Sequence, residues 1–152
     1  MSGSDQFPPQ TGRYAVKAKG GADWQAFNTA RLEISVGQPY HEDEKMEATL
    51  EWARMRFHRV VILVGDTLQR FNFMFERGWN EEKAFLHTRA EGTAWLTRHA
   101  TSIAKAHADI FRWDDWKHHV DYHRSQAEAD AIYLTNSEFR SAVDNSITET
   151  WE

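Results

Sequence analysis

The sequence predicts an α/β protein with a Rossmann-like three-layer fold, in which helices flank a parallel sheet. A strand-like alternation at residues 31–36 is followed by a helical period that starts at Glu42 and by a continuous apolar run at 60–64. A strand, a helix and a second strand within roughly 35 residues form a βαβ unit, whose strands lie parallel in one sheet. An unbroken apolar strand is typical of a sheet covered on both faces.

The first predicted strand lies in RLEISV, where Leu32, Ile34 and Val36 alternate, and it ends at Ser35 or Val36 before the turn-prone GQP. The helix after it is expected to run from Glu42 to about Arg56, because apolar residues recur there at helical spacing. These residues are Met46, Leu50, Ala53 and Phe57. Acidic residues at 42–44 favour the helix start, where they interact with the helix dipole.

The rest of the chain reads as further helices with one more strand. We expect a short helix at 68–77 that Gly78 stops, and then a long helix that Asn80 caps and that runs to about His107. A short strand is expected at 110–113, a helix capped by Asp114 that reaches Tyr133, and a last helix from Asn136 or Ser137 to the C-terminus.

Composition limits the architecture and the chemistry. A chain of 152 residues, of which 41% are hydrophobic, is expected to form a single domain at 14–152 after a flexible tail at 1–13. Neither a membrane-spanning run nor a secretory signal is recognisable, so we expect a cytoplasmic protein. The absence of cysteine excludes disulfides, thiolate metal sites and cysteine nucleophiles. A net charge of -5 means that any nucleic-acid binding must come from a local patch.

Two residues follow predicted strands and are candidates for a site. Ser35 and Asp66 fall at the carboxyl ends of the strands, where open parallel sheets bind ligands. Gly37 lets the backbone approach a ligand closely, and His41 is the nearest base for a serine nucleophile. The alternative is that Ser35 satisfies its loop, that Asp66 caps the next helix, and that His41 is a surface residue.

A group of histidines suggests a second kind of chemistry. Asp115, His119 and His123 recur every four residues, with His118 beside them, so they share one helix face that can hold a metal. The segment lacks the glutamate of an HExxH motif, and exposed polar faces of this composition are common. We therefore expect an exposed polar face here, with neither a metal nor another cofactor.

Basic residues on the predicted long helix form a stripe. Lys83, His87, Arg98 and Lys105 fall within an arc of about 60° at 100° per residue, and apolar residues lie opposite. Such a stripe can lie along a phosphate backbone, although most charged helix faces are only solvated.

The order of four segments resembles that of tRNA-dependent cyclodipeptide synthases. The segments are LEISVGQPYHEDEK, LEWARMRF, VVILVGDTLQRFN and RGWNEEKA. In that family a strand ends in a serine loop, a helix with a Trp-Ala and Arg-Phe end follows, a buried strand then closes on Asp, and a turn precedes a long basic helix. The resemblance spans about residues 14–152, more faintly after the third strand.

The resemblance implies a fold like the catalytic domain of class I aminoacyl-tRNA synthetases and a reaction on two aminoacyl-tRNAs without ATP. The serine takes the first aminoacyl group as an ester, the second aminoacyl-tRNA supplies the attacking amine, and the dipeptidyl ester cyclises to a diketopiperazine. Carried over to this chain, Ser35 is the acyl acceptor, and the substrate-binding residues are Glu33, Gly37, Gln38, Tyr40 and Asp66. The basic stripe corresponds to the helix of that family that contacts tRNA.

The chain departs from the family pattern in two places. Glu33 stands where many members have glycine, so its side chain is expected to contact a substrate amine or to alter which amino acid fits. The Tyr/Glu pair that holds the substrate amine has no equivalent before Glu152, which predicts either a fragment or a shortened relative. The alternative function is therefore a non-catalytic relative that binds aminoacyl-tRNA or a partner enzyme, and a homodimer is also left open.

Overall fold

The computed structural model describes residues 14, 16 and 26–150, and the tail expected at 1–13 lies outside this part. The described chain divides into two compact units, one that ends at Trp113 and one that begins at Asp114. In its described residues, the first unit contains three strands and four α-helices. They are β1 (Thr29–Ile34), α1 (Asp43–Arg56), β2 (Arg59–Val64), α2 (Arg70–Arg77), α3 (Glu81–Arg98), α4 (Ala100–Lys105) and β3 (Asp109–Arg112). Short 3-10 helices, Pro39–His41 and Thr67–Gln69, precede α1 and α2.

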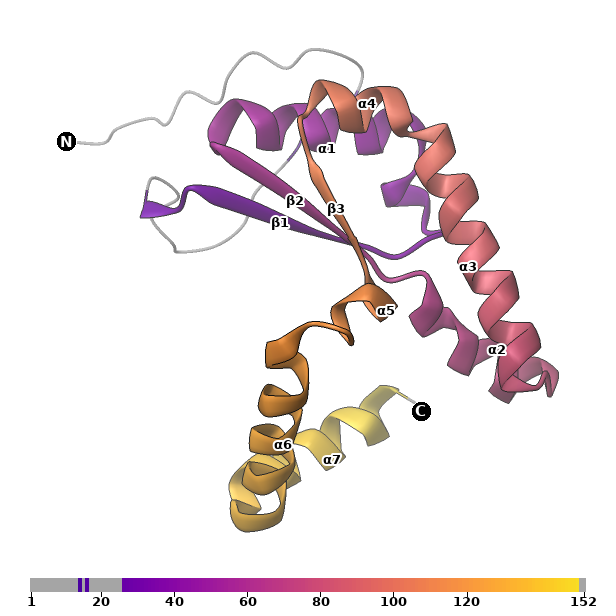
Figure 1. Cartoon of the computed structure of the whole chain (residues 1–152), viewed down its shortest axis with the longest axis vertical. Coiled ribbons are helices and arrows are strands. Elements are labelled where there is room, and N and C mark those ends of the chain that lie inside the picture. Colours follow the sequence, from indigo (N-terminus) through magenta and orange to yellow (C-terminus); the bar gives the residue numbers. More distant parts are fainter. Residues whose placement is uncertain (1–13, 15, 17–25, 151–152) are drawn as a thin grey trace. The chain divides into compact units, whose positions relative to one another are not determined.

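The three strands form one parallel sheet in the order β1-β2-β3 (Figure 1). Register places Ile34 opposite Val64, and Gly65 donates its N–H to the Ile34 carbonyl at 2.8 Å. The residues that follow these strands, Ser35 and Gly65–Asp66, are therefore neighbours at the carboxyl edge of the sheet. The predicted α/β class and the Rossmann-like parallel sheet are confirmed.

The core lies between the sheet and helices α1, α3 and α4. Alternate residues of β1 and β2 point into it, which explains why the first strand alternates in sequence. Its completely buried members include Met46, Ile62 and Trp95. Helices α1 and α4 run side by side along this layer (Figure 1), so the sheet edge that carries Ser35 is fixed by a packed scaffold.

The predicted long helix is two helices. It was expected to run from Asn80 to about His107, but α3 ends at Arg98 and α4 begins at Ala100. Its start is as predicted, because the Asn80 side chain accepts a hydrogen bond from the Lys83 N–H. The interruption falls on His99, a buried residue whose Nε2 contacts Glu42 at 3.2 Å. A polar side chain that must reach a partner on another helix is a constraint that helical periodicity does not reveal.

The second unit consists of helices. Helix α5 (Trp113–Trp116) begins at the boundary, α6 spans Val120–Thr135, and α7 spans Ser137–Thr150. The helix predicted from Asp114 to Tyr133 is thus two elements, and His119, not Asp114, caps α6 by accepting from the Asp121 N–H. Tyr133 of α6 donates a hydrogen bond to Asp144 of α7 at 2.8 Å. Whether 14–152 is one domain stays a prediction.

Candidate active site

Ser35 is half-buried and follows β1 directly. The next residues form a turn in which Gly37 has a φ of 86°, a left-handed conformation that favours glycine. Among the described residues, no hydrogen-bond partner of the Ser35 hydroxyl is found. The strand ends one or two residues earlier than the sequence suggested, which leaves Ser35 in the loop rather than in the sheet.

His41 holds the backbone of Ser35, not its hydroxyl. The Ser35 N–H donates to His41 Nδ1 at 3.0 Å. Burial lowers the pKa of His41, although the Ser35 contact and the Glu42 carboxylate act in the opposite direction. The lowered pKa leaves the ring neutral near pH 7, and the same Nδ1 also lies 3.3 Å from the Ser35 carbonyl oxygen. The structure thus shows His41 in contact with the backbone of the serine loop, and its role as a base stays a prediction.

Trp95 ties this loop to helix α3. Its side chain is completely buried, and its Nε1 donates to the His41 carbonyl at 2.8 Å. Next to it, the Glu42 carboxylate contacts His99 Nε2 and accepts from Arg98 at 3.0 and 3.1 Å. Burial tends to raise the pKa of Glu42, but the hydrogen bonds from His99 and Arg98 outweigh it and lower the pKa overall. The serine loop is thus anchored on both sides.

Asp66, the second predicted strand-end residue, is a buried carboxylate. Its Oδ2 accepts from Arg112 Nε at 2.9 Å and from Arg112 Nη2, and Nη2 also donates to the Arg89 carbonyl at 2.6 Å. Its other oxygen, Oδ1, is buried without a hydrogen-bond partner. Asp66 precedes the 3-10 helix Thr67–Gln69 without a side-chain cap, so the interpretation as a helix cap is wrong.

Helix α3 makes room for this carboxylate at Gly92. A Cβ at that position would lie 2.6 Å from both Cβ and Cγ of Asp66, and closer still to Oδ2. Real Cβ contacts are never that short, so glycine is required where α3 crosses the end of β2. Gly92 lowers the intrinsic helix propensity of α3, but the packing of α3 against Asp66 requires it.

A hollow of about 190 Å³ opens beside these residues. It is bordered by Val36, Gly37, Asp66, Gln69, Phe73, His87, Thr88 and Glu91. A cavity of about 150 Å³ is large enough for a benzene molecule, so this one has room for an amino-acid side chain. Among the lining residues there are two carboxylates and neither lysine nor arginine. Ser35 itself is not among the lining residues, although Val36, the next residue in sequence, is.

The predicted substrate-binding residues are distributed unevenly around this hollow. Gly37 and Asp66 border it, whereas Gln38 and Tyr40 are exposed in the same loop, outside its lining. Glu33 is exposed on β1, also outside the lining, and pairs with Arg31. The part that Glu33, Gln38 and Tyr40 play in binding stays a prediction.

The basic residues expected to bind tRNA lie on two helices, and their role in binding stays a prediction. Arg98 is paired with Glu42, and Lys105 lies on α4 beyond the break at His99. Lys83 and His87 instead belong to an aromatic group at the junction of α2 and α3. There Phe73 and Trp79 stack at 5.2 Å, His87 packs edge-on against both, and Lys83 Nζ lies 4.2 Å from the Trp79 ring centre.

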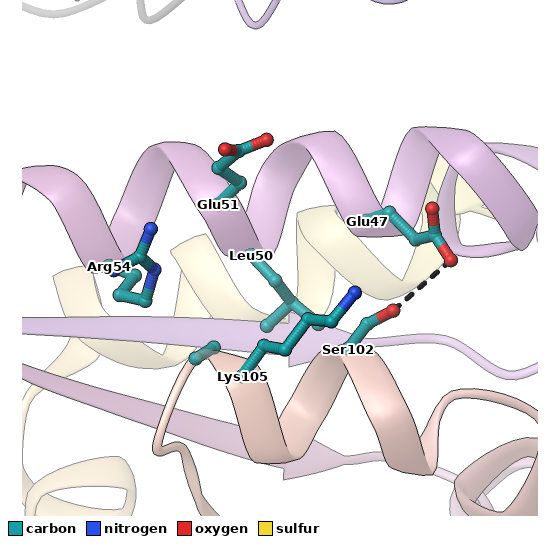
Figure 2. A pocket seen from close by; sticks show the side chains of 7 residues that line it. Glu47, Leu50, Glu51, Arg54, Ser102 and Lys105 are labelled. Atoms are coloured by element: carbon teal, nitrogen blue, oxygen red, sulfur yellow. Dashed lines mark hydrogen bonds between the residues drawn. The ribbon is translucent and has the colours of Figure 1, made fainter. Parts of the chain in front are cut away.

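Lys105 borders a different hollow, which is shown in Figure 2. This hollow of about 160 Å³ lies between α1 and α4, and its lining is Glu47, Leu50, Glu51, Arg54, Ser102, Lys105 and Ala106. Ser102 donates to Glu47 at 3.2 Å across it. Two carboxylates and two cations line this hollow, so its charge composition differs from that of the first, and it serves as an internal comparison.

The histidines of the second unit are exposed. Asp115, His118, His119 and His123 all lie at the surface, and the His119 ring stacks on Trp116 at 5.5 Å. Within the described part of the chain, no group of three or more histidine, aspartate and glutamate residues is arranged to hold a metal. No helix in that part is long and apolar enough to cross a membrane.

Sequence reasoning missed Arg112, Glu91 and Phe73. Arg112 ends the third strand and reaches back over 46 residues to Asp66, a pairing for which the sequence offers no local signal. Glu91 precedes Gly92, and the glycine inside a helical pattern was the available sign that α3 approaches something closely there.

Comparison with known proteins places this arrangement in context. No protein-family model and no curated protein matches the sequence. Among solved structures, a cyclodipeptide synthase from Fluoribacter dumoffii is 28% identical, with a TM-score of 0.76 over 88% of this chain and 62% of that one. The cyclodipeptide synthase of Streptomyces noursei is 19% identical, with a TM-score of 0.62 over 76% of this chain and 57% of that one.

A Mycobacterium tuberculosis protein, described as a cyclodipeptide synthetase related to type I tRNA synthetases, is 15% identical. Its TM-score is 0.64 over 85% of this chain and 60% of that one. The chain thus spans 57% to 62% of the length of these three proteins. The resemblance to cyclodipeptide synthases is confirmed at the level of structure.

Proposed function

We propose that this chain is an aminoacyltransferase of the cyclodipeptide synthase type, with Ser35 as the acyl acceptor and aminoacyl-tRNA as the donor. The observation that carries the proposal is the position of Ser35. It is half-buried after β1, and the two residues that follow it in sequence, Val36 and Gly37, line a hollow. The structural likeness to the Fluoribacter dumoffii enzyme supports it, because that likeness covers 88% of this chain at 28% identity.

The proposed chemistry transfers one ester into another. The Ser35 hydroxyl attacks the carbonyl carbon of the aminoacyl ester, the bond to the terminal ribose oxygen breaks, and the serine proton passes to that oxygen. The amine of a second aminoacyl-tRNA then attacks the carbonyl carbon of the seryl ester, which forms the peptide bond, breaks the bond to the serine oxygen and restores the Ser35 hydroxyl. The free amine of the resulting dipeptidyl-tRNA attacks its own ester, which closes the diketopiperazine and releases the second tRNA. Because the donor is already an activated ester, the transfer requires neither ATP nor a cofactor.

The aromatic group at the α2–α3 junction is the part of the surface best suited to the RNA. Arg77 and Lys83 lie over Phe73 and Trp79, at 4.2 to 5.4 Å from the ring centres. Unpaired bases stack on aromatic rings, and nearby cations bind the phosphates. Phe73 and His87 also border the hollow, so an RNA end bound here would bring its ester close to Ser35.

The test is direct detection of the acyl-enzyme. The purified chain is incubated with a mixture of aminoacyl-tRNAs, and intact-mass and peptide mass spectrometry are used to detect an aminoacyl ester on Ser35. Cyclic dipeptides are measured in the same reactions. We expect an ester on the wild-type protein and none on Ser35→Ala.

A matched control is Ser102→Ala, which removes a serine hydroxyl from the hollow between α1 and α4 (Figure 2). This variant should still form the ester. Cyclic dipeptide formation that persists at the wild-type level in Ser35→Ala would contradict the proposal. RNA binding without any ester would instead favour the non-catalytic alternative.

A further inference from the structure

Strand β1 forms an open edge of the sheet. In the described part of the chain β1 pairs only with β2, which lies between β1 and β3 (Figure 1). The carbonyls of Asn28 and Ile34 accept hydrogen bonds from N–H groups at the start of β2 and just after its end, at 3.1 and 2.8 Å. Because the direction of the backbone groups alternates along a strand, the even-numbered residues of β1 bond to β2. The N–H and C=O groups of Arg31 and Glu33 therefore point outward.

The side chains on this edge leave it open to a further strand. Proteins usually protect an unpaired strand edge with proline, a bulge or charged side chains. Strand β1 has six residues and contains neither a proline nor a break in its register with β2. Its charges are Arg31 and Glu33, which lie on one face, pair with each other and have side chains that are 66% and 62% exposed. One charge of each sign does not exclude a second copy of the same strand, because opposite charges attract across a strand pair.

An antiparallel alignment of two β1 strands, centred on Leu32, makes these charges complementary. Arg31 of one copy then lies opposite Glu33 of the other, so each arginine faces a glutamate across the pair. The same two residues carry the outward backbone groups, so they exchange N–H···O=C bonds with the other copy. The Arg31–Glu33 pair within each copy remains, and every charge in the group then has neighbours of opposite sign.

The opposite edge of the sheet is less suitable. Strand β3 has four residues, Asp109 pairs with β2 at 2.7 Å, and Arg112 turns to Asp66. Its charged side chains are thus held by other elements of the chain. The Ser35 N–H, just after β1, already donates to His41, so a strand added to β1 ends before the serine loop.

We infer that two copies of this chain associate through β1 as a two-fold symmetric dimer, in which the two sheets join into one. This inference goes beyond the proposed function and does not depend on it. A two-fold contact occupies the β1 edge of both copies, so it closes at two. Because the added ladder is short, the dimer is expected to be weak, with a dissociation constant of about 10–100 μM.

The experiment measures the mass of the full chain by sedimentation velocity, at concentrations that span the expected dissociation constant. Arg31→Glu and Glu33→Arg each place like charges opposite one another and should weaken the dimer by about 10- to 100-fold. The double variant with both changes again has opposite charges across the pair and should dimerise like the wild type. Asp109→Arg reverses a charge on the other edge of the sheet and should leave the dimer unchanged.

Amide hydrogen exchange of the wild type identifies the strand involved. The amides of Arg31 and Glu33 should exchange rapidly in dilute solution and become protected as the concentration rises. The amides of Leu32 and Ile34 point to β2, so they should be protected at every concentration and provide the internal reference. Circular dichroism checks the fold of the charge variants, and the exchange measurement decides the question if a variant does not fold.

Three results would overturn the inference. They are a monomer at every concentration, a dimer that both single charge reversals leave intact, and protection of Arg31 and Glu33 that does not change with concentration. The last would mean that another part of the same chain covers this edge. Ser35→Ala should dimerise like the wild type, so a dimer without an ester on Ser35 would refute only the transfer, and a monomer that forms the ester would refute only the association.

Discussion

Replacement of Gly92 by alanine tests whether the contact between α3 and the Asp66 carboxylate shapes the site. In an exposed helix interior this change stabilises by about 1 kcal/mol, because alanine is the better helix former. Here the added Cβ would lie 2.6 Å from Cβ and Cγ of Asp66. Overpacking of this kind costs about 1–3 kcal/mol, and any displacement of Asp66 also weakens its buried pair with Arg112.

The net expectation is a loss of about 2–4 kcal/mol in the free energy of unfolding, since breaking a buried ion pair alone costs about 3–5 kcal/mol. The assay is urea unfolding at 25 °C, followed by tryptophan fluorescence and circular dichroism. Ala94→Gly, at an exposed position of the same helix, measures the propensity contribution separately and should cost about 1 kcal/mol.

A double variant makes the test sharper. In an Asp66→Gly background the carboxylate and its Cβ are both gone, so the obstacle to a side chain at position 92 is removed. Gly92→Ala should then stabilise that background by up to about 1 kcal/mol, a reversal of sign. If Gly92→Ala were neutral or stabilising in the otherwise native chain, the close contact between α3 and Asp66 would be refuted.

Three further outcomes are expected. Trp95→Phe should lower the free energy of unfolding by about 1–3 kcal/mol in a urea titration, because the His41 carbonyl loses its buried donor. Asn80→Ala should cost about 1 kcal/mol in the same assay, with Asn80→Ser nearly neutral as its control, because only alanine lacks an oxygen for the Lys83 N–H. Stability should fall on acidification, in thermal melts between pH 7 and pH 4. The lowered pKa of His41 means that the unfolded chain takes up a proton first below about 6.5, and the lowered pKa of Glu42 removes a further contribution below 4.5. A melting temperature that stays flat or rises as the pH falls over that range would contradict the lowered pKa of both His41 and Glu42.

The sequence by itself determined the elements whose signals are local. Alternation at 31–36 and the apolar run at 60–64 identified two strands of a parallel sheet, because the side-chain period of a strand is visible in a few residues. Asn80 and Gly78 marked a helix start and a helix end, since capping depends on one or two positions. The same local logic put Ser35 and Asp66 at strand ends, and parallel pairing made those ends neighbours.

Only the tertiary structure decided what these residues meet. Asp66 looked like a helix cap until Arg112, from the third strand, and Gly92, from α3, were seen to enclose it. His41 was a candidate base from its place in the sequence, and only the structure showed that its ring contacts the Ser35 backbone. Such contacts join residues far apart in the chain or depend on the direction of a side chain, and the free energy that selects them comes from burial and charge pairing in the folded state, which leaves no periodic trace in the sequence.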